Sequence, residues 1–349
     1  MKHWFRLVIA YFLLFSVSFS SGQDLTKTII AFGSCANENE DQPILQKVAD
    51  LRPDFFIYLG DNIYGDTYDM SMLKAKYQKL NQKPEFKSLN NATKILATWD
   101  DHDFGTNDSG RHYPFIAESK QIFLDFFNEP KDSNRRKRAG IYTSFVHEVK
   151  GRKVQIILLD TRTFRDNLRN YRGEVHNQAK YFYPLDYYFH EQNDSTILGN
   201  NQWRWLEDQL LVEADIRIIG SSTQFGIEFN GYEAWANFPH EQQKMFNIIR
   251  KTKANGVIFI SGDVHYSEIS EIKPDGFYPI YDFTSSGITS TWHFATPNKN
   301  RIEGPVMDNH YGKITIDWSL KDPEIKMENI DIKGNQRFEF SFPLSRIKF

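Results

Sequence analysis

The stretch Asp54-Phe-Phe-Ile-Tyr-Leu-Gly-Asp-Asn-Ile-Tyr64 indicates the fold class, because an apolar run stops abruptly at polar residues. The run shows no polar–apolar alternation, which is typical of a strand buried on both faces. Similar runs occupy residues 28–32 and 256–260, and they are followed by Gly33-Ser-Cys35 and Ser261-Gly-Asp-Val-His265. The pattern therefore predicts buried strands that each end in polar residues.

Helical periodicity separates these runs. Apolar residues fall on one helical face within 44–51, 203–210 and 245–249, and Pro53 is expected to end the first helix. Further strands are predicted at 95–99, 154–159 and 216–219, so the order indicates an α/β domain with a largely parallel or mixed sheet. Residues 313–318 and 337–342 alternate with period two, which predicts antiparallel strands added to a sheet.

The first residues have the layout of a secretory leader. A short basic start precedes an apolar run at 7–19 and small residues at 18–22. The alternative is an uncleaved anchor, but the run is short against the ~20 residues that span a bilayer. We therefore expect a signal peptide at 1–22, one domain at 23–349, no membrane span after cleavage, and a periplasmic or secreted protein.

The composition of the chain gives little further information about its function. The net charge of -3 gives no sign of a nucleic-acid partner or an anionic membrane surface, and the oligomeric state is left open. The segment 171–201 follows neither period and is rich in Tyr, Phe, His and Asn. A long irregular insert of this kind is often a functional loop, and a surface meander is the alternative.

Cys35 is the only cysteine in the chain. In an oxidising compartment cysteines usually pair, but a lone cysteine cannot pair within its own chain. It is therefore a buried bystander, an intermolecular partner, a reactive thiol or a metal ligand. Its position directly after a predicted strand favours the ligand.

Other side chains that bind metals also follow predicted strands. They are Asp61 and Tyr64 after the second strand, Asp101 and His102 after the third, and Asp263 and His265 after the run at 256–260. Ligands of open α/β sheets bind beyond the carboxyl ends of strands, and carboxylate, imidazole, phenolate and thiolate all bind di- or trivalent metals. Each motif alone is weak, but together they indicate a metal site.

The order Gly-Asp-x-x-Tyr at 60–64, Asp-Asp-His-Asp at 100–103 and Gly-Asp-Val-His at 262–265 resembles the calcineurin-like metallophosphoesterase superfamily. The segments 32–35, 159–162 and 199–206 are similar to its alkaline phosphatase D (PhoD-like) family. The resemblance spans nearly all of the predicted domain except 165–198. It implies two packed mixed β-sheets flanked by helices in α/β/β/α layers. The family's extra N-terminal β-domain is not expected ahead of the first strand.

The resemblance also implies roles for the candidate residues. Fe³⁺ would be held by Cys35, Asp61, Tyr64 and His265, and Ca²⁺ by Asp61, Asp101 and Asp263, although other divalent metals are compatible. His102 would be the catalytic acid or charge stabiliser. Arg162 would contact phosphate, because a guanidinium meets two oxygens at once. Asn62 lies near these residues in the sequence and is a candidate for binding substrate or metal. Ser222 and Gln224 are further candidates in place of a missing histidine motif, and Asn107 is more simply a turn residue.

The expected activity is hydrolysis of a small-molecule phosphate mono- or diester by a water activated between two metals. Two cations about 3.5–4 Å apart neutralise the phosphate charge and stabilise the leaving oxygen. A nucleotide- or phospholipid-specific phosphodiesterase is the alternative, since the aromatic insert could stack a base. A catalytically inactive binding protein on the same fold is disfavoured, because no expected ligand is missing.

Overall fold

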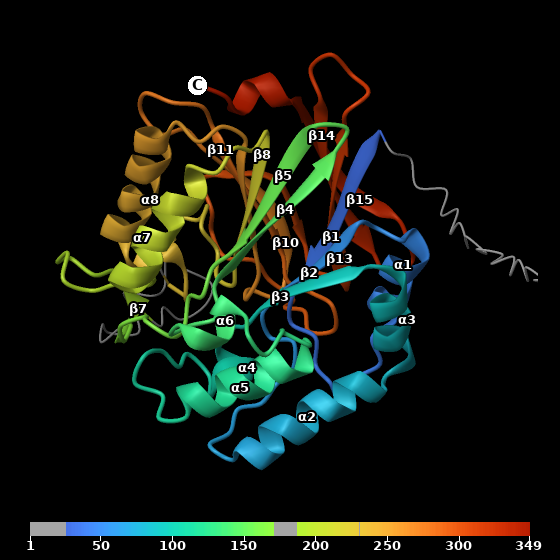
Figure 1. Cartoon of the computed structure of the whole chain (residues 1–349), viewed down its shortest axis with the longest axis vertical. Coiled ribbons are helices and arrows are strands. Elements are labelled where there is room, and N and C mark those ends of the chain that lie inside the picture. Colours follow the sequence, from blue (N-terminus) through green and yellow to red (C-terminus); the bar gives the residue numbers. More distant parts are fainter. Residues whose placement is uncertain (1–25, 171–186, 230) are drawn as a thin grey trace, which may run out of the picture.

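The computed structural model in Figure 1 describes residues 26–170, 187–229 and 231–349. The predicted leader at 1–22 and the aromatic residues at 181–183 of the insert lie outside the described residues. Within the described ranges, no helix combines the length and the apolar character needed to cross a membrane.

A six-stranded mixed sheet has the order β15-β14-β13-β1-β2-β3. Its parallel strands are β1 (Lys27–Gly33), β2 (Phe55–Leu59) and β3 (Lys94–Thr98). The antiparallel strands are β13 (His310–Asp317), β14 (Glu324–Asp331) and β15 (Gln336–Pro343). The two tail segments predicted to be antiparallel strands, now β13 and β15, are therefore confirmed.

A seven-stranded mixed sheet has the order β12-β10-β11-β9-β8-β5-β4. Its parallel centre contains β5 (Arg152–Leu158), β8 (Ile216–Ser221), β9 (Val257–Ser261) and β11 (Ile280–Ser285). The antiparallel strands are β4 (Thr143–Val149), β10 (Ser267–Ile272) and β12 (Arg301–Val306). A separate small pair joins β6 (Arg169–Asn170) to β7 (Tyr187–Tyr188).

Helices cover the outer face of each sheet (Figure 1). Those on the six-stranded side and at its carboxyl end are α1 (Pro43–Leu51), α2 (Met70–Gln82), α3 (Pro84–Ala92), α4 (Asp101–Phe104), α5 (Ile116–Phe126) and α6 (Asn134–Lys137). The seven-stranded side carries α7 (Gly199–Leu210) and α8 (Pro239–Thr252), and two 3-10 turns are η2 (Trp235–Asn237) and η3 (Leu344–Ile347). The three predicted helices correspond to α1, α7 and α8. As predicted, α1 ends before Pro53.

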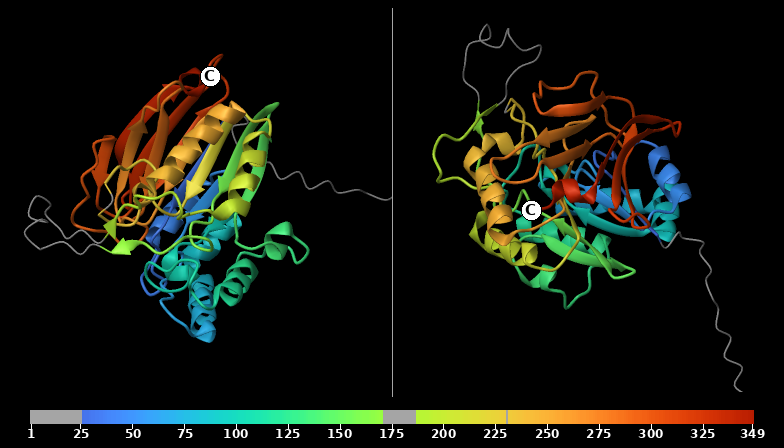
Figure 2. Two further views of the ribbon diagram at one scale, coloured as in Figure 1. Left: turned by 90° about the vertical axis from the view of Figure 1, so that its left-hand side faces the viewer. Right: turned by 90° about the horizontal axis from the view of Figure 1, so that it is seen from above.

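The two sheets pack face to face, and Figure 2 shows the layers from two further sides. Alternate side chains of the central strands point to opposite faces. Phe32 and Ile57 pack in the core between the sheets, whereas Phe56 and Tyr58 pack in the core under the helices. Because both faces are buried, these strands contain almost no polar residues. The predicted α/β/β/α architecture is confirmed.

The carboxyl ends of the parallel strands of both sheets meet at one edge, which lies at the lower end of the sheets in Figure 1. Hydrogen bonds join the sheets there. Thr98 Oγ1 donates to the carbonyl oxygen of Leu159 at 2.6 Å, and the backbone N–H of Ile288 donates to the carbonyl oxygen of Ser34 at 3.1 Å. This shared edge positions the candidate site.

His310 is a fully buried histidine at the start of β13. Its Nδ1 lies 2.7 Å from the carbonyl oxygen of Asp308, and its Nε2 accepts the backbone N–H of Ser286 at 3.1 Å. The ring packs against Gly287, where an added Cβ would lie only 2.4 Å from it. Burial lowers the pKa of His310 to about 4, so the folded protein holds the neutral imidazole at pH 7.

We expect acid to destabilise the wild-type protein more than a His310→Gln variant. An unfolded histidine has a pKa of about 6.5 and takes up a proton that buried His310 refuses. The stability conferred by the neutral ring is thus present above about pH 6.5 and is lost as the pH falls toward 4. Urea denaturation should show about 2 kcal/mol of excess loss in the wild type between pH 7 and pH 5.

The control for this experiment is His112→Gln, which replaces an exposed histidine and should keep the wild-type pH dependence. An undiminished pH dependence in His310→Gln would contradict the assignment.

Candidate metal centre

The predicted donors converge at the shared edge of the two sheets. Ligand atoms within 4.8 Å of one another form one group of Cys35, Asp61 and His265, and a second group of Asp61, Asp100, Asp101 and Asp263. The hydroxyl of Tyr64 lies 3.4 Å from His265 Nε2, beside the first group. The structure therefore brings all six predicted metal ligands together, and Asp61 belongs to both groups.

Four of these residues have an unusual backbone. Cys35, Asp61, Asp263 and His265 have φ angles of 59°, 49°, 75° and 57°, in the left-handed region that non-glycine residues rarely adopt. Such conformations cost of order 1–3 kcal/mol each and persist where the surrounding structure enforces them. The loops after β1, β2 and β9 thus turn sharply, and this turn directs their donor side chains to one point.

Asp103 holds two of the loops in place. Its buried carboxylate accepts the backbone N–H of Asp100 at 2.7 Å and that of Asp61 at 3.2 Å, and it also accepts the Tyr77 hydroxyl at 3.0 Å. Burial raises the pKa of Asp103 to about 7, although the hydrogen bonds from Asp100 and Tyr77 oppose the shift. The last residue of the Asp-Asp-His-Asp motif is therefore a scaffold for the donors and not itself one of them.

Asn62 belongs to the same scaffold. It is fully buried, and its amide nitrogen donates to Asp103 and to the carbonyl oxygen of Thr98 at 2.9 Å. Substrate binding by Asn62 stays a prediction, and its amide nitrogen is already engaged inside the protein.

Arg162 is also fully buried, and it faces carboxylates. Its guanidinium pairs with Asp100, with Glu233 at 2.6 Å and with Asp101 at 3.6 Å. Burial disfavours the charged guanidinium, but these carboxylates outweigh it and raise the pKa of Arg162 well above its ordinary value. Phosphate contact by Arg162 stays a prediction, because the geometry shows an arginine that compensates buried acids.

Sequence reasoning missed several acids of this site, among them Asp66, Asp100 and Glu233. Asp100 stands in the recognised motif but was not assigned a role. Glu233 also pairs with Arg165 at 3.1 Å, and Asp66 lies 2.8 Å from His102 Nδ1. Glu233 and Asp66 lie in segments without helical or strand periodicity, so no local pattern marked them.

The electrostatics of the donor groups suit cations. Burial raises the pKa of Asp61 and Asp263 well above the ordinary range and that of Asp100 to about 8. The neighbouring acids add to this rise, whereas Arg162 opposes it at Asp100 and Asp263. Burial alone would raise the pKa of Asp101, but Arg162 and His102 outweigh it and lower that pKa. A cation among these carboxylates would lower every one of these pKa values, because it favours the ionised form.

An unsatisfied oxygen supports the same conclusion. Asp61 Oδ1 is buried and accepts no hydrogen bond from the residues that the structure describes. An uncompensated buried acceptor is costly, and coordination of a cation would remove that cost. The donor types and this oxygen therefore fit a metal centre.

His102 lies beside the donors and is oriented by Asp66. Its Nδ1 is 2.8 Å from both oxygens of that carboxylate, and its ring lies 4.5 Å from the ring of Tyr64. Burial alone would lower the pKa of His102, but the hydrogen bond with Asp66 and the charges of Asp61 and Asp101 raise it to about 10. The contact with Asp66 therefore favours the protonated imidazole.

The remaining candidates lie further from the donors. Ser222 donates to Asp100 at 2.6 Å and so contacts the site indirectly. Gln224 is engaged with Glu268 and Thr284 at 3.0 Å each. Asn107 is exposed, and its backbone N–H donates to Asp66 at 3.1 Å. None of these three residues belongs to the donor groups.

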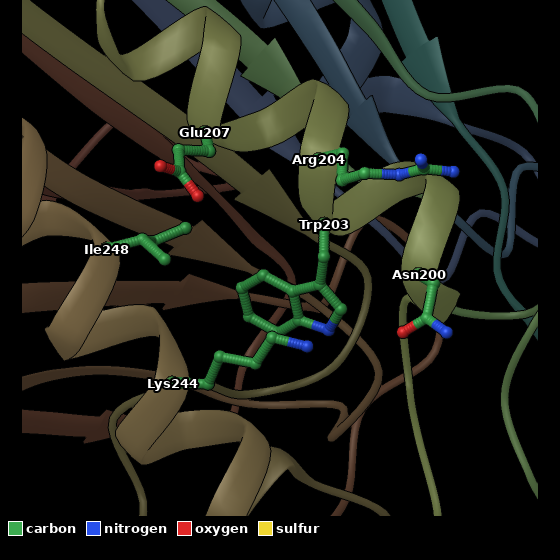
Figure 3. Close-up of a pocket in the computed structure, with 6 residues that line it drawn as sticks. All are labelled: Asn200, Trp203, Arg204, Glu207, Lys244 and Ile248. Carbon is green, nitrogen blue, oxygen red and sulfur yellow. The ribbon is translucent and has the colours of Figure 1, made fainter.

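A separate pocket lies between α7 and α8 (Figure 3). It is lined by Asn200, Trp203, Arg204, Glu207, Lys244 and Ile248. Lys244 Nζ lies 4.6 Å from the centre of the Trp203 ring, and Glu207 pairs with Lys251. No predicted site residue lines this pocket, so it is not part of the candidate centre.

Two packed mixed sheets, with carboxylate, imidazole and thiol side chains at their common edge, define the class of calcineurin-like metallophosphoesterases. The model of the PhoD-like phosphatase family matches residues 30–341. The chain belongs to the PhoD-like phosphatase family, a family of phosphoric ester hydrolases, and the resemblance seen in the motifs is confirmed.

Individual relatives are distant. Alkaline phosphatase D of Bacillus subtilis (strain 168) is 21% identical over 306 residues, which cover 76% of this chain and 50% of that protein. The chain thus spans half the length of this curated relative. The structure of PhoD matches with a TM-score of 0.72 and 17% identity, covering 93% of this chain and 71% of that one. The structure of a dimetal phosphatase from Danio rerio matches with a TM-score of 0.53 and 14% identity, covering 91% of this chain and 99% of that one. At these identities the two structures show the fold alone.

We expect Arg162→Gln to lower the free energy of unfolding by about 3–5 kcal/mol, because it leaves Asp100 and Glu233 buried without their partner. Urea denaturation measures this loss. The matched control is Arg111→Gln, which breaks an exposed pair with Asp166 and should cost at most about 1 kcal/mol. Unchanged stability with a large loss of turnover would contradict the scaffold role and favour the phosphate contact.

Proposed function

We propose that the chain is an exported, metal-dependent phosphoesterase that hydrolyses phosphate mono- or diesters with a water activated between two metal ions. The observation that carries this proposal is the position of Asp61. Its carboxylate belongs to a group with Cys35 and His265 and also to a group with Asp100, Asp101 and Asp263. A carboxylate shared by two donor groups is suited to bridge two cations, and two adjacent cations are the usual means of stabilising phosphoryl transfer.

The donor types favour the two metals that the family resemblance implies. Cys35, Asp61, Tyr64 and His265 include a thiol and a phenol whose anions would offset the charge of Fe³⁺. Asp61, Asp101 and Asp263 offer the carboxylate oxygens that Ca²⁺ prefers. Burial raises the pKa of the Cys35 thiol to about 12, so its thiolate depends on a bound cation. Bound there, the two cations would neutralise the phosphate and acidify the attacking water.

His102 and Asp66 also support the proposal, because together they can supply a proton to the leaving group. A general acid must be protonated at the working pH, and the hydrogen bond with Asp66 favours the protonated form of His102. The carboxylate contacts Nδ1, which leaves Nε2 as the nitrogen that can donate a proton to the leaving oxygen. We therefore assign His102 as the acid and Asp66 as the residue that orients it.

Export rests on the leader pattern at 1–22, which supports a periplasmic or secreted location.

Monoesters and diesters can use the same centre and differ in the room that they need around it. An inactive binding protein is the weaker alternative, because all six expected ligands lie at the site.

The test is hydrolysis of p-nitrophenyl phosphate and bis(p-nitrophenyl) phosphate by the protein, with and without chelator and added calcium. We expect chelator to abolish turnover and calcium to restore it, and the ratio of the two rates ranks monoesters against diesters. Asp61→Asn should lose at least about 100-fold in turnover, because both metals would share that carboxylate. Asp50→Asn at an exposed position is the control. Turnover that survives both chelator and Asp61→Asn would rule out the two-metal proposal.

His102→Ala should lower kcat by roughly 10²–10⁴-fold, and Asp66→Asn should lower it less, while both keep their metals. The loss should be larger with phenyl phosphate than with p-nitrophenyl phosphate, since the poorer leaving group needs the proton more. Steady-state kinetics with both esters, together with metal analysis, measure this difference. An equal loss with both esters, or loss of the metals, would contradict the role of His102 as acid.

A further inference from the structure

Ser286 lies between two of the predicted iron ligands. Its Oγ is 3.1 Å from Cys35 Sγ and accepts the backbone N–H of His265 at 3.0 Å. Both Ser286 and Cys35 are fully buried, so water does not compete for these contacts. Ser286 directly follows β11, and sequence reasoning did not identify it.

The direction of the hydroxyl proton follows from its partners. A backbone N–H can only donate, so Ser286 Oγ is the acceptor toward His265 and its own proton remains available. The other close contacts of the sulfur include Asp61 Oδ2 at 3.3 Å and the carbonyl oxygen of Asp263 at 3.5 Å. These oxygens are acceptors and disfavour a thiolate. Ser286 is therefore the nearest group that can donate a hydrogen bond to a Cys35 thiolate.

The backbone of Ser286 is itself fixed. Its N–H donates to His310 Nε2 at 3.1 Å, and the Asp308 carbonyl oxygen near His310 Nδ1 determines the tautomer of that ring. Gly287 allows the ring to approach this closely, because any larger residue would collide with it. The hydroxyl thus has a fixed position relative to Cys35 and His265.

The loop at 286–292 also holds the backbones of both ligands. The N–H groups of Thr289 and Ser290 donate to the carbonyl oxygen of Cys35 at 3.1 and 3.2 Å, and that of Trp292 donates to the carbonyl oxygen of His265 at 3.0 Å. The Trp292 ring stacks on the His265 ring, with centroids 5.2 Å apart. One loop therefore connects ligands that follow β1 and β9, in different sheets.

We propose that Ser286 is a positioning residue for the ferric ion: its hydroxyl holds Cys35 and His265 in one geometry and donates a hydrogen bond to the Cys35 sulfur. The inference rests on the proposed function, in which both residues bind Fe³⁺. A hydrogen bond to a coordinated sulfur draws electron density from it, and groups that orient ligands in this way commonly change metal affinity by about 10–100-fold.

The experiment compares four proteins loaded with ferric ion alone: wild type, Ser286→Ala, Ser286→Thr and Ser285→Ala. Ser285 is the matched control, because it is equally buried and its hydroxyl has no hydrogen-bond partner among the described residues. The measurements are iron affinity and the thiolate-to-iron absorption band, which is identified by its loss in Cys35→Ser. Ser286→Ala should shift this band to lower energy and weaken iron binding about 10–100-fold.

The two other serine variants should match the wild type, since Ser286→Thr keeps the hydroxyl and the Ser285 hydroxyl makes no hydrogen bond among the described residues. If Ser286→Ala keeps the wild-type band and affinity, Ser286 is not a positioning residue, although Cys35 remains a ligand. If Ser286→Thr shifts the band as far as Ser286→Ala, packing and not the hydroxyl is responsible, which also overturns the inference. A wild-type protein without a band that depends on Cys35 would instead overturn the iron assignment of the proposed function.

Discussion

The buried carboxylate of Asp103 connects the two loops from which the six-stranded sheet supplies most of its donors. It accepts the backbone N–H groups of Asp61 and Asp100, which follow β2 and β3. Without this acceptor, both N–H groups would be buried and unpaired, which costs about 1–3 kcal/mol for each group. The left-handed backbone of Asp61 would also lose its restraint. The position of Asp61, which belongs to both donor groups, is thus set by Asp103, which is not itself a donor.

The seven-stranded sheet contributes in a different way, through charge and through backbone contacts. Arg162 follows β5 and compensates Asp100 and Glu233, so the acids at the edge can remain close together. The loop after β11 meets the loops after β1 and β9 by hydrogen bonds to backbone and side chain. The group of Cys35, Asp61 and His265 draws on both sheets, because Cys35 and Asp61 follow strands of one sheet and His265 follows a strand of the other.

The elements that could be predicted from sequence are those whose burial leaves a simple pattern. β2 and the first four residues of β9 are apolar because both faces are covered, and α7 and α8 each present one apolar stripe. In contrast, β10 contains the buried Glu268, whose charge is balanced by Arg301 from β12. An internal ion pair of this kind cannot be recognised in a single segment. The helix α2 was missed because few of its residues are buried and most are polar.

The same limit applies to the site. The donors were found because each directly follows a recognisable strand, whereas Asp66 and Ser286 act on residues that lie 36 and 251 positions away along the chain. Distant partners of this kind become visible only in three dimensions. Their identity depends on which strand ends meet, and the local pattern of residues carries no information about that.

The long separation between donors also determines when the centre can form. Cys35 lies in the first strand–loop unit, and its loop is bonded to Thr289, 254 positions later. β1 is likewise completed by β13, near the end of the chain. Most of the chain must therefore be synthesised before the donor group of Cys35, Asp61 and His265 is complete, so an ion held by that group would be acquired late in biogenesis. For a chain that crosses a membrane before it folds, the ions available on the far side, and not those of the cytoplasm, would decide which metals occupy the centre.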